Sequence, residues 1–306
     1  MTEPQVSIIT ATYNRSNVLR YTIASVLRSQ FTSWEQIVVG DACTDDSEAV
    51  VAGFGDPRLR FYNLRQNVGE QSGPNNVGVA YARGRYIAFL NHDDLWFPDH
   101  LGAAVAALER SGADLVFTQA LSVLRDGSFW LLGNTPDGKY TPHTFVPASL
   151  WLMRRELLAR VGLWPPGRAS FNAPSQAWLW RAWRAGAQLR SVPRVTMLVL
   201  PSGFRPGGYA RRDWDEHRQL YARLCDEADF RERALEQALT SQVNRWTALS
   251  LATPLRQLAR SLIYRGALAL GVPPLSVNYA LRYGRRGGML AYLRRVRGLP
   301  RRVDPS

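Results

Sequence analysis

Short apolar segments alternate with segments of helical spacing through the first 120 residues, and this alternation limits the fold more than any other feature. Apolar runs at 6–9, 37–39 and 86–90 predict buried strands, and the stretches 17–29 and 98–109 carry apolar residues at helical spacing. Strands that alternate with helices in this way are typical of a parallel sheet covered by helices on both faces. We therefore expect an α/β fold.

Weaker patterns predict the remaining elements. Two turn signals, Asp126-Gly127 and Asp137-Gly138, separate short aromatic runs and indicate hairpins. The segment 202–208 is rich in glycine and is expected to be a flexible loop, and from 213 onward the chain is expected to be mostly helical. The other predicted elements are strands at 59–64, 114–118 and 195–200 and helices at 48–52, 74–82, 154–161 and 176–185.

Polar residues gather directly after three of the predicted strands, in the segments 10–14, 40–41 and 91–94. In open α/β sheets ligands bind at the carboxyl ends of the strands, so these segments are expected to form one site. Asp93 and Asp94 are adjacent carboxylates at such an end, which suits a hard divalent cation that also binds phosphate oxygens. The competing interpretation is a cap for the next helix.

The 306 residues include 38 Lys and Arg against 25 Asp and Glu, a formal charge of +13, and Lys139 is the single lysine. Most of the excess lies after residue 250, where eleven arginines accompany one acid, Asp304. Leu and Tyr are interspersed with these arginines, a pattern typical of helices that lie on anionic membranes. The alternative is the solvated face of a helical subdomain. Nucleic acid is not expected as a partner, because no nucleic-acid-binding motif accompanies the charge.

Several classes of protein are disfavoured by what the sequence lacks. No GxGxxG or GxxxxGK[ST] segment occurs, which argues against dinucleotide oxidoreductases and P-loop enzymes. Cys43 and Cys225 are too few for a disulfide framework and are expected to be reduced thiols. Neither a signal peptide nor a run of ~18 apolar residues is predicted. We therefore expect a cytoplasmic location, with peripheral attachment to the inner face of the cytoplasmic membrane as a possibility.

The segments 6–15, 37–45, 67–90 and 91–94 resemble, in this order, the motifs of family 2 glycosyltransferases, and the resemblance covers roughly residues 5–200. It implies the GT-A fold, a Rossmann-like and mostly parallel sheet flanked by helices, here with a C-terminal helical basic extension. The implied organisation is a catalytic domain at 1–208, divided into a nucleotide-sugar half (1–118) and an acceptor half (119–208), and a C-terminal helical basic region at 209–306.

The resemblance also implies roles for single residues. Asp41 is expected to accept a hydrogen bond from the nucleotide base, so a UDP sugar is the favoured donor, with dTDP or GDP as alternatives; Gly40 replaces a frequent second acid. Asp93 is expected to bind Mn²⁺ or Mg²⁺. Asn91 stands at the first position of the DxD motif, where an Asp is usual, and the missing carboxylate is expected to weaken metal binding. The other implied donor-binding residues are Thr10, Thr12, Asn67, Asn76 and Arg83, the last of which is equally well read as a solvated arginine at a helix end.

Three further residues are candidates for contacts with the metal or the diphosphate. His143 and His217 are candidates for a third metal ligand, although a surface or structural role is favoured for both. Arg205 lies in the glycine-rich loop 202–208, and closure of such a loop would bring its side chain to the diphosphate. An ordinary linker is the alternative.

The general base is missing from its expected position. Relatives carry an acidic residue at the start of a Trp-rich helix, and Ala177, next to Gln176, stands where the resemblance places that Asp. Alanine cannot accept a proton, and the Gln176 amide is a poor base. Three explanations stay open: an introduced substitution, a naturally base-deficient protein, or a base elsewhere, with Asp99, Glu156 and Asp213 as candidates.

The acceptor is expected to meet Trp178 and Trp180, whose rings suit the C–H faces of sugars, together with Asp94. Core packing is the favoured alternative for each ring. The implied function is an inverting, metal-dependent hexosyl- or deoxyhexosyltransferase that acts on a glycan or lipid-linked acceptor in surface polysaccharide synthesis. The alternative is a catalytically silent sugar-nucleotide or glycan-binding protein of the same fold. A nucleotidyltransferase is disfavoured, because residues 12–15 lack a glycine-rich basic signature.

Overall fold

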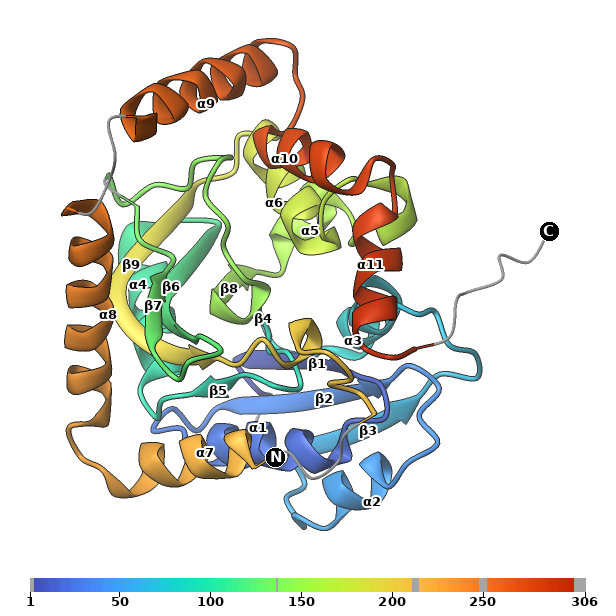
Figure 1. Ribbon diagram of the computed structural model, residues 1–306. Coiled ribbons are helices and arrows are strands. Elements are labelled where there is room, and N and C mark those ends of the chain that lie inside the picture. Colours follow the sequence, from blue (N-terminus) through green and yellow to red (C-terminus); the bar gives the residue numbers. More distant parts are fainter. Residues whose placement is uncertain (1–2, 136, 211–214, 248–251, 300–306) are drawn as a thin grey trace.

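The computed structural model describes residues 3–135, 137–210, 215–247 and 252–299 (Figure 1). Within these residues nine strands form one sheet. Each strand of the N-terminal part lies where an apolar run predicts it. The strands are β1 (Val6–Thr12), β2 (Trp34–Gly40), β3 (Leu59–Asn63), β4 (Tyr86–Phe89), β5 (Leu95–Trp96), β6 (Leu115–Val123), β7 (Phe129–Leu132), β8 (Trp151–Arg154) and β9 (Leu189–Val199).

The sheet has the order β3-β2-β1-β4-β8-β6-β9-β5, and β7 pairs with β6 outside this path. Its first four strands are all parallel, with β1 and β2 in register from Val6↔Trp34 to Thr12↔Gly40. β8 then joins both β4 and β6 antiparallel, while β6 and β9 run parallel. The predicted α/β sheet flanked by helices is confirmed, and antiparallel pairs in its second half are added to it. The parallel half brings the carboxyl ends of β1, β2 and β4 to one edge.

Strand β2 is buried on both faces, which explains its unbroken apolar run. Side chains alternate along a strand, so Ile37 and Val39 enter the large core, and Val38 packs with Leu19 and Ile23 of helix α1 on the other side. The helices of residues 16–184 are α1 (Ser16–Leu27), α2 (Ser47–Ala52), α3 (Ser72–Tyr81), α4 (His100–Ser111), α5 (Glu156–Val161) and α6 (Pro174–Arg184).

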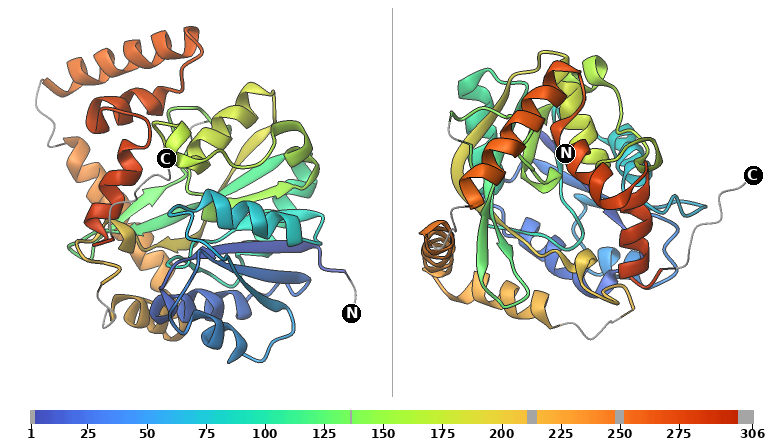
Figure 2. Two further views of the ribbon diagram at one scale, coloured as in Figure 1. Left: turned by 90° about the vertical axis from the view of Figure 1, so that its right-hand side faces the viewer. Right: turned by 45° about the horizontal axis from the view of Figure 1, so that its top comes forward.

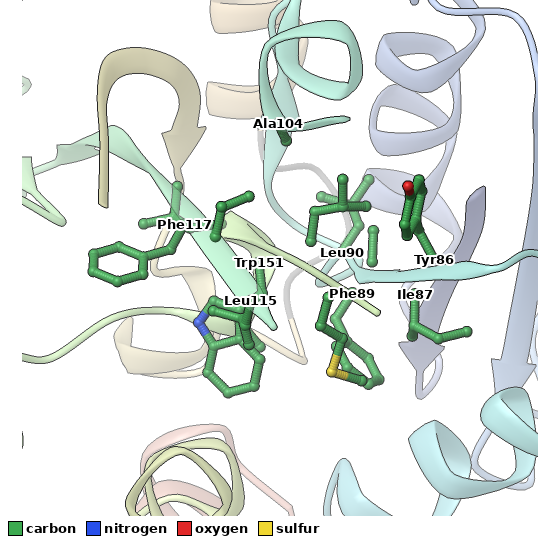
Figure 3. Close-up of a cluster of buried hydrophobic side chains, with 14 of the residues drawn as sticks. Tyr86, Ile87, Phe89, Leu90, Ala104, Leu115, Phe117 and Trp151 are labelled. Carbon is green, nitrogen blue, oxygen red and sulfur yellow. The ribbon is translucent and has the colours of Figure 1, made fainter. Parts of the chain in front are cut away.

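The large core joins the two halves of the sheet. Figure 3 shows Ile87 and Phe89 of β4 beside Leu115 and Phe117 of β6 and Trp151 of β8, and none of these side chains is more than 2% exposed. The Trp151 ring meets the Phe89 ring edge-on, with 6.2 Å between their centroids. Burial of each such side chain stabilises the fold by about 1.5–3 kcal/mol. The core therefore holds the parallel half, which carries the polar strand ends, rigidly against the mixed half.

Two predicted turns have different outcomes. Asp126-Gly127 lies between the antiparallel strands β6 and β7, as the turn signal predicts. Asp137-Gly138 does not connect two strands among the described residues, where Lys139 makes only an isolated bridge to Arg190. The glycine-rich segment 202–208 begins with a short 3₁₀ helix, η3 (Ser202–Phe204), so it is partly ordered rather than a plain loop.

The C-terminal region is helical, as predicted, and its last helix returns to the sheet. α7 packs on α1, α8 packs on β6 and β7, and α11 contacts both η3 and the 3₁₀ helix η2 (Gly167–Ala169). Figures 1 and 2 show α9 at the periphery of the molecule. The helices are α7 (Glu216–Asp226), α8 (Phe230–Thr247), α9 (Ala252–Ala269), α10 (Pro274–Tyr283) and α11 (Gly288–Val296).

Candidate functional site

A cavity of about 330 Å³ lies at the carboxyl ends of β1, β2 and β4. Its size is typical of small-molecule sites. The three polar segments predicted to form one site are therefore brought together, and residues of α11 and of the segment 199–209 complete the wall. The lining residues that follow the strands are Ala11, Thr12, Tyr13, Asp41, Asn91, His92, Asp93 and Asp94.

Asp41 organises the β2 side of the cavity. Its Oδ1 accepts a hydrogen bond from the Val68 amide at 2.6 Å, and its Oδ2 accepts one from the Gly69 amide at 2.7 Å. Asn67 donates from Nδ2 to the backbone oxygen of Asp41 at 2.8 Å and to its Oδ2 at 3.1 Å. A Cβ at Gly40 would lie 2.6 Å from Asn63 Oδ1, so a larger residue here would require the Asn63 side chain to shift.

A left-handed residue ties the loops after β1 and β2 together. Asn14 has φ of 49°, and its Oδ1 accepts from the amides of Thr44 at 2.8 Å and Asp45 at 3.3 Å. Asn tolerates this conformation better than most residues because its short polar side chain bonds locally. Beside this junction, Thr12 lines the cavity, and its buried Oγ1 has no hydrogen-bond partner among the described residues. A bound molecule in the cavity could supply that partner.

Asp93 is connected to Arg15 through one hydroxyl. Ser202 Oγ donates to Asp93 Oδ2 at 2.5 Å and accepts from Arg15 Nη2 at 3.0 Å. Arg15 is 1% exposed, and its guanidinium also donates to the Gly208 carbonyl and lies 4.9 Å from the Tyr209 ring centroid. Burial opposes ionisation of Asp93, but neighbouring His92 and the Ser202 hydroxyl outweigh it, so its pKa is lowered. Asp93 is therefore anionic at the cavity.

The pKa of Asp94 is raised, whereas the pKa of the preceding residue, Asp93, is lowered. Burial, with the Asp93 charge second, raises the pKa of Asp94 to about 8. Its Oδ2 accepts from Ser149 Oγ at 2.6 Å and Asn91 Nδ2 at 2.9 Å, and its Oδ1 accepts from the Leu200 amide at 3.2 Å. Because its oxygens meet these partners, Asp94 positions Asn91 and fixes the segment before η3 to the end of β4.

Two histidines hold the backbone around Asp93. His92 donates from Nδ1 to the Ala11 carbonyl at 3.1 Å, and His217 of α7 donates from Nε2 to the Asp93 carbonyl at 3.1 Å. Burial lowers the pKa of His92, and it lowers that of His217 to about 4, so the His217 ring is neutral near pH 7. His217 thus reaches the backbone of Asp93 rather than its carboxylate. His143 is exposed and stacks on Tyr264, with 6.2 Å between ring centroids.

The donor set at the strand end fits a hard divalent cation that is completed by ligand oxygens. Among the residues that the structure describes, no group of three or more His, Cys, Asp or Glu is placed to hold a metal. Mg²⁺ needs fewer, since it is usually bound by one or two protein carboxylates plus phosphate oxygens and water. Asp93 supplies one ionised carboxylate at the cavity, and Asn91 lines the cavity with its amide directed to Asp94.

Four residues implied as donor-binding lie outside the described cavity wall. Thr10 is buried and its Oγ1 accepts from Gln36 Nε2 at 3.0 Å, a contact within the sheet. Asn76 exchanges two hydrogen bonds with the backbone of Trp164, at 3.0 and 2.9 Å. Arg83 pairs with Glu35 at 2.8 Å, and Arg205 pairs with Glu216 of α7. Each of these side chains stabilises a loop or helix contact within the protein, and its contact with the donor stays a prediction.

The start of α6 carries the expected base position. Ala177 is half-buried and its amide bonds the Ala173 carbonyl at 3.1 Å, one turn beyond the cavity-lining residues 173–175. Gln176 is 1% exposed and exchanges two hydrogen bonds with the backbone of Val146, with Nε2 donating at 2.8 Å and Oε1 accepting at 3.3 Å. The Gln176 amide is therefore used to hold the 146 segment to α6.

The two tryptophans expected at the acceptor pack against other residues of the protein. Trp178 is 0% exposed, and its Nε1 donates to the Gly162 carbonyl at 2.8 Å. Trp180 is 9% exposed and stacks on Trp183, with 5.2 Å between centroids. Neither ring is among the described residues of the cavity wall, where the exposed aromatic side chains are Phe145 and Phe204. Trp178 is thus a core residue in this structure, in keeping with the packing role favoured from the sequence, and its contact with the acceptor stays a prediction.

Several residues in or beside the cavity were not among the predicted site residues. Arg15 and Ser202 do not line the cavity, but they contact Asp93 through one chain of hydrogen bonds. Arg15 lies three residues after β1 and could have been found as a charged residue near a strand end. Ser202 and Tyr209 carried no signal beyond their glycine-rich surroundings. Arg294 and Arg297 of the C-terminal segment line the cavity, whereas the basic pattern predicted a membrane surface for them.

Comparison with known proteins places this geometry in a family. The family model described as "Glycosyl transferase family 2" matches residues 7–162. Over 145 residues the chain is 32% identical to the "Succinoglycan biosynthesis protein ExoO" of Rhizobium meliloti, covering 47% of this chain and 41% of that one. Over 112 residues it is 30% identical to the "UDP-Glc:alpha-D-GlcNAc-diphosphoundecaprenol beta-1,3-glucosyltransferase WfgD" of Escherichia coli, covering 37% and 44%. The chain spans less than half the length of either relative.

Two solved structures share the fold. TarS 1–349 of S. aureus in complex with UDP-GlcNAc aligns with a TM-score of 0.57 at 19% identity, covering 98% of this chain and 95% of that chain. The mannosyltransferase PcManGT from Pyrobaculum calidifontis, in complex with GDP-Man and Mn²⁺, aligns with a TM-score of 0.54 at 19% identity, covering 92% and 87%. At such identities the likeness establishes the fold alone, and the predicted GT-A fold is confirmed.

Proposed function

The chain belongs to glycosyl transferase family 2, and from this premise we propose that it binds a nucleotide-diphosphate sugar and transfers the sugar to a hydroxyl group with inversion. The observation that carries the proposal is the convergence of Asp41 and Asp93, from two different strand ends, on one cavity. The relatives support a role in surface polysaccharide synthesis, since those described above include a succinoglycan biosynthesis protein and a glucosyltransferase acting on a diphosphoundecaprenol-linked sugar. The proposed acceptor is accordingly a glycan or a lipid-linked glycan.

The donor nucleotide is proposed to be UDP, with its base at Asp41. The two Asp41 oxygens accept from the Val68, Gly69 and Asn67 nitrogens, and a carboxylate offers about four acceptor positions. Asp41 lines the cavity, where a carboxylate oxygen suits the N–H of a uracil imide. The UDP-GlcNAc of TarS is in keeping with this choice, while the GDP-Man of PcManGT keeps GDP as the alternative.

Mn²⁺ or Mg²⁺ is the proposed cofactor, held by Asp93 with Asn91 beside it. When bound, such an ion supplies positive charge to the diphosphate oxygens. The protein's part is to keep Asp93 ionised, which Ser202 and Arg15 favour, and to hold its backbone in place through His217. Asp94 takes no direct part in this proposal, because its oxygens already meet Ser149, Asn91 and Leu200.

The proton of the attacking hydroxyl has no acceptor at Ala177. Of the other candidate bases, Asp99 forms ion pairs with Arg194 and Arg231 at 2.6 and 2.9 Å, Glu156 is exposed on α5, and Asp213 lies outside the described residues. Neither Asp99 nor Glu156 is among the described residues of the cavity wall. We therefore propose slow transfer for the chain as it stands. A catalytically silent sugar-nucleotide-binding protein is the second candidate, favoured by the same observation.

Titration calorimetry with UDP, GDP, dTDP and their common sugars, each with and without Mn²⁺, tests the donor proposal. Binding of one nucleotide family that tightens with Mn²⁺ is the expected result. Product analysis with the bound donor then separates a slow transferase, which releases nucleoside diphosphate over hours, from a silent binder, which releases none. Absence of binding by every nucleotide at millimolar concentration contradicts the donor proposal in both forms.

The periphery of the molecule supports a second proposal, that α9 and α10 attach the protein to the inner face of the cytoplasmic membrane. Leu258 and Leu262 of α9 are 58% and 61% exposed, Leu281 of α10 is 81% exposed, and Arg260 and Arg265 are exposed on the same helix as the first two. Apolar side chains among arginines suit an anionic bilayer surface. No helix within the described residues is both long enough and apolar enough to cross a membrane.

Vesicle sedimentation tests this second proposal. The full chain is expected to sediment with phosphatidylglycerol vesicles and not with phosphatidylcholine vesicles, and the Leu258→Ser, Leu262→Ser pair is expected to abolish this. Leu239→Ser on α8 removes a leucine that is 45% exposed outside α9 and α10, and it serves as the matched control. Equal sedimentation of all three proteins contradicts attachment through α9.

A further inference from the structure

Helix α11 forms a wall of the donor cavity, although it lies at the opposite end of the sequence from β1. Arg294 and Arg297, on its last turn and just beyond it, line the same cavity as Asp41 and Asp93. α11 contacts η2 and η3, both of which contribute residues to the cavity wall. The described wall of this cavity lacks Arg83 and Arg205, the arginines expected at the donor, and Arg294 and Arg297 supply two guanidinium groups there instead.

Arg294 occupies a space that exists because residue 69 is a glycine. Its Nη1 lies 3.4 Å from the Gly69 carbonyl oxygen, and a Cβ at Gly69 would come within 2.7 Å of the same nitrogen. Gly69 also has φ of +81°, a conformation that favours glycine. The amide of this residue is the one that donates to Asp41 Oδ2. Arg294 is thus placed next to the segment proposed to bind the nucleotide.

Arg297 likewise occupies a space that exists because residue 203, which also lines the cavity, is a glycine. Its Nε donates to the Gly203 carbonyl at 3.3 Å, and a Cβ at Gly203 would lie 2.7 Å from its Nη2. The guanidinium also lies 5.0 Å from the centroid of the Tyr209 ring, which it shares with Arg15. Gly203 follows Ser202, whose hydroxyl donates a hydrogen bond to Asp93. Arg297 is thus placed next to the proposed metal-binding carboxylate.

The chemistry of the two groups suits a diphosphate. Guanidinium is planar and permanently charged, and it donates two parallel hydrogen bonds to phosphate oxygens. The carboxylates nearby are already engaged, Asp41 by backbone amides and Asp93 by Ser202. A nucleotide whose base is at Asp41 and whose phosphates reach Asp93 would pass between Gly69 and Gly203, where the two arginines stand.

We propose that Arg294 and Arg297 of α11 bind the diphosphate of the nucleotide donor, so that the C-terminal region is part of the donor site. This rests on the proposed function, because it presumes a nucleotide-diphosphate ligand. It also revises the predicted division of the chain at 208, since a domain that ended there would lack both guanidinium groups.

The test compares UDP with uridine as ligands of the full chain in saturating Mg²⁺. Arg297→Gln and Arg294→Gln are each expected to weaken UDP binding by about tenfold, as befits loss of a charge-assisted contact, and to leave uridine binding unchanged. Arg295→Gln is the matched control: Arg295 is the exposed neighbour on the same helix, 5.7 Å from the Tyr292 ring centroid, and is expected to change neither affinity.

Gly203→Ala provides a second variant that keeps every charge. Its added methyl group would take the space of the Arg297 guanidinium, so the same selective loss of UDP affinity is expected even if Arg297→Gln folds poorly. Equal UDP affinity in Arg294→Gln, Arg297→Gln, Gly203→Ala and Arg295→Gln overturns the assignment while leaving the proposed function intact. Failure of the unchanged protein to bind any nucleoside diphosphate overturns both.

Discussion

Arg83 and Glu35 form an ion pair at 2.8 Å in which the Glu35 side chain is only 1% exposed. Glu35 Oε1 also accepts from Ser7 Oγ at 2.7 Å and from the Arg83 amide at 2.7 Å, and Arg60 pairs with Oε2 at 2.6 Å. A buried carboxylate is tolerated here because every neighbouring donor is directed at it. The pair fixes the turn between α3 and β4, and through it the start of β4, the strand that precedes Asn91.

Replacing Arg83 is therefore expected to affect stability rather than donor binding. Arg83→Met removes one of the two cations at Glu35 and should lower the free energy of unfolding by about 1–3 kcal/mol, the usual cost of leaving a buried polar group under-bonded. Urea denaturation measures this loss, and calorimetry measures UDP affinity in parallel. A large fall in UDP affinity with unchanged stability would instead indicate that Arg83 binds the diphosphate.

The same carboxylate predicts part of the acid sensitivity of the fold. Burial alone would raise the pKa of Glu35, but the Ser7 hydroxyl, the Arg83 amide and the two guanidinium groups together lower it. A lowered pKa stabilises the fold above the ordinary value of 4.5, and this contribution is lost as the pH falls through the folded-state pKa. The stability difference between the unchanged protein and Glu35→Gln should therefore be largest at pH 7 and shrink below pH ~4.5. A difference that stays constant from pH 7 to pH 3 would contradict this.

Asp93→Asn tests the proposed metal ligand. The change keeps the shape of the side chain but removes its charge, so Mn²⁺ should no longer tighten UDP binding. The expected loss of metal-dependent affinity exceeds about tenfold, which is the lower limit usual even for residues that only support a metal ligand. Uridine affinity without metal should stay unchanged, because Asp41 and its partners are untouched. An Mn²⁺ effect of normal size in Asp93→Asn would exclude this carboxylate as the ligand.

Ala177→Asp tests whether the missing base limits transfer. Ala177 is half-buried at the start of α6, one turn from cavity-lining residues, so a carboxylate there adds little internal crowding. A positioned general base typically accelerates a reaction by about 10²–10⁴-fold, and transfer by Ala177→Asp should rise by this order with unchanged donor affinity. Ala177→Asn has the same shape without a base and serves as the control. Equal rates for the two variants would show that the proton leaves by another route.

Trp178→Phe separates a core role from an acceptor role. The indole Nε1 donates to the Gly162 carbonyl at 2.8 Å, and phenylalanine leaves that oxygen unpaired in a buried site. The expected cost is about 1–3 kcal/mol in chemical denaturation, with no change in the KM for the acceptor. A raised KM at unchanged stability would place the ring at the acceptor instead.

The parallel half of the fold could be predicted from sequence because its signals are local. β1, β2 and β4 each contain a short apolar run, and polar residues follow soon after each run. The mixed half could not be predicted as completely. β9 begins at Leu189 rather than 195, and its first part contains Pro193 and two arginines, so nothing local identifies it as a strand. It forms because β6 supplies a partner edge, with a register shift near Gln119.

The residues of the candidate site also fall into those that local sequence predicts and those that depend on distant contacts. Asp41 and Asp93 were predictable because a residue that follows a parallel strand lies at the cavity edge wherever its side chain points. Asn76, Arg83 and Trp178 have partners at Trp164, Glu35 and Gly162, and those pairings depend on contacts between distant segments. Arg294 and Arg297 were hidden for a further reason. Their sequence pattern is the same as that of the exposed arginines around them, and only the return of α11 to the sheet distinguishes them.

The position of α11 in the cavity wall has a consequence for synthesis of the protein. The ribosome delivers β1 before α11, so the N-terminal strands emerge while the wall opposite them is still untranslated. Until α11 has emerged and packed, the strand-end carboxylates face an open surface without Arg294 and Arg297. A nascent chain therefore lacks the complete pocket until α11 has been made.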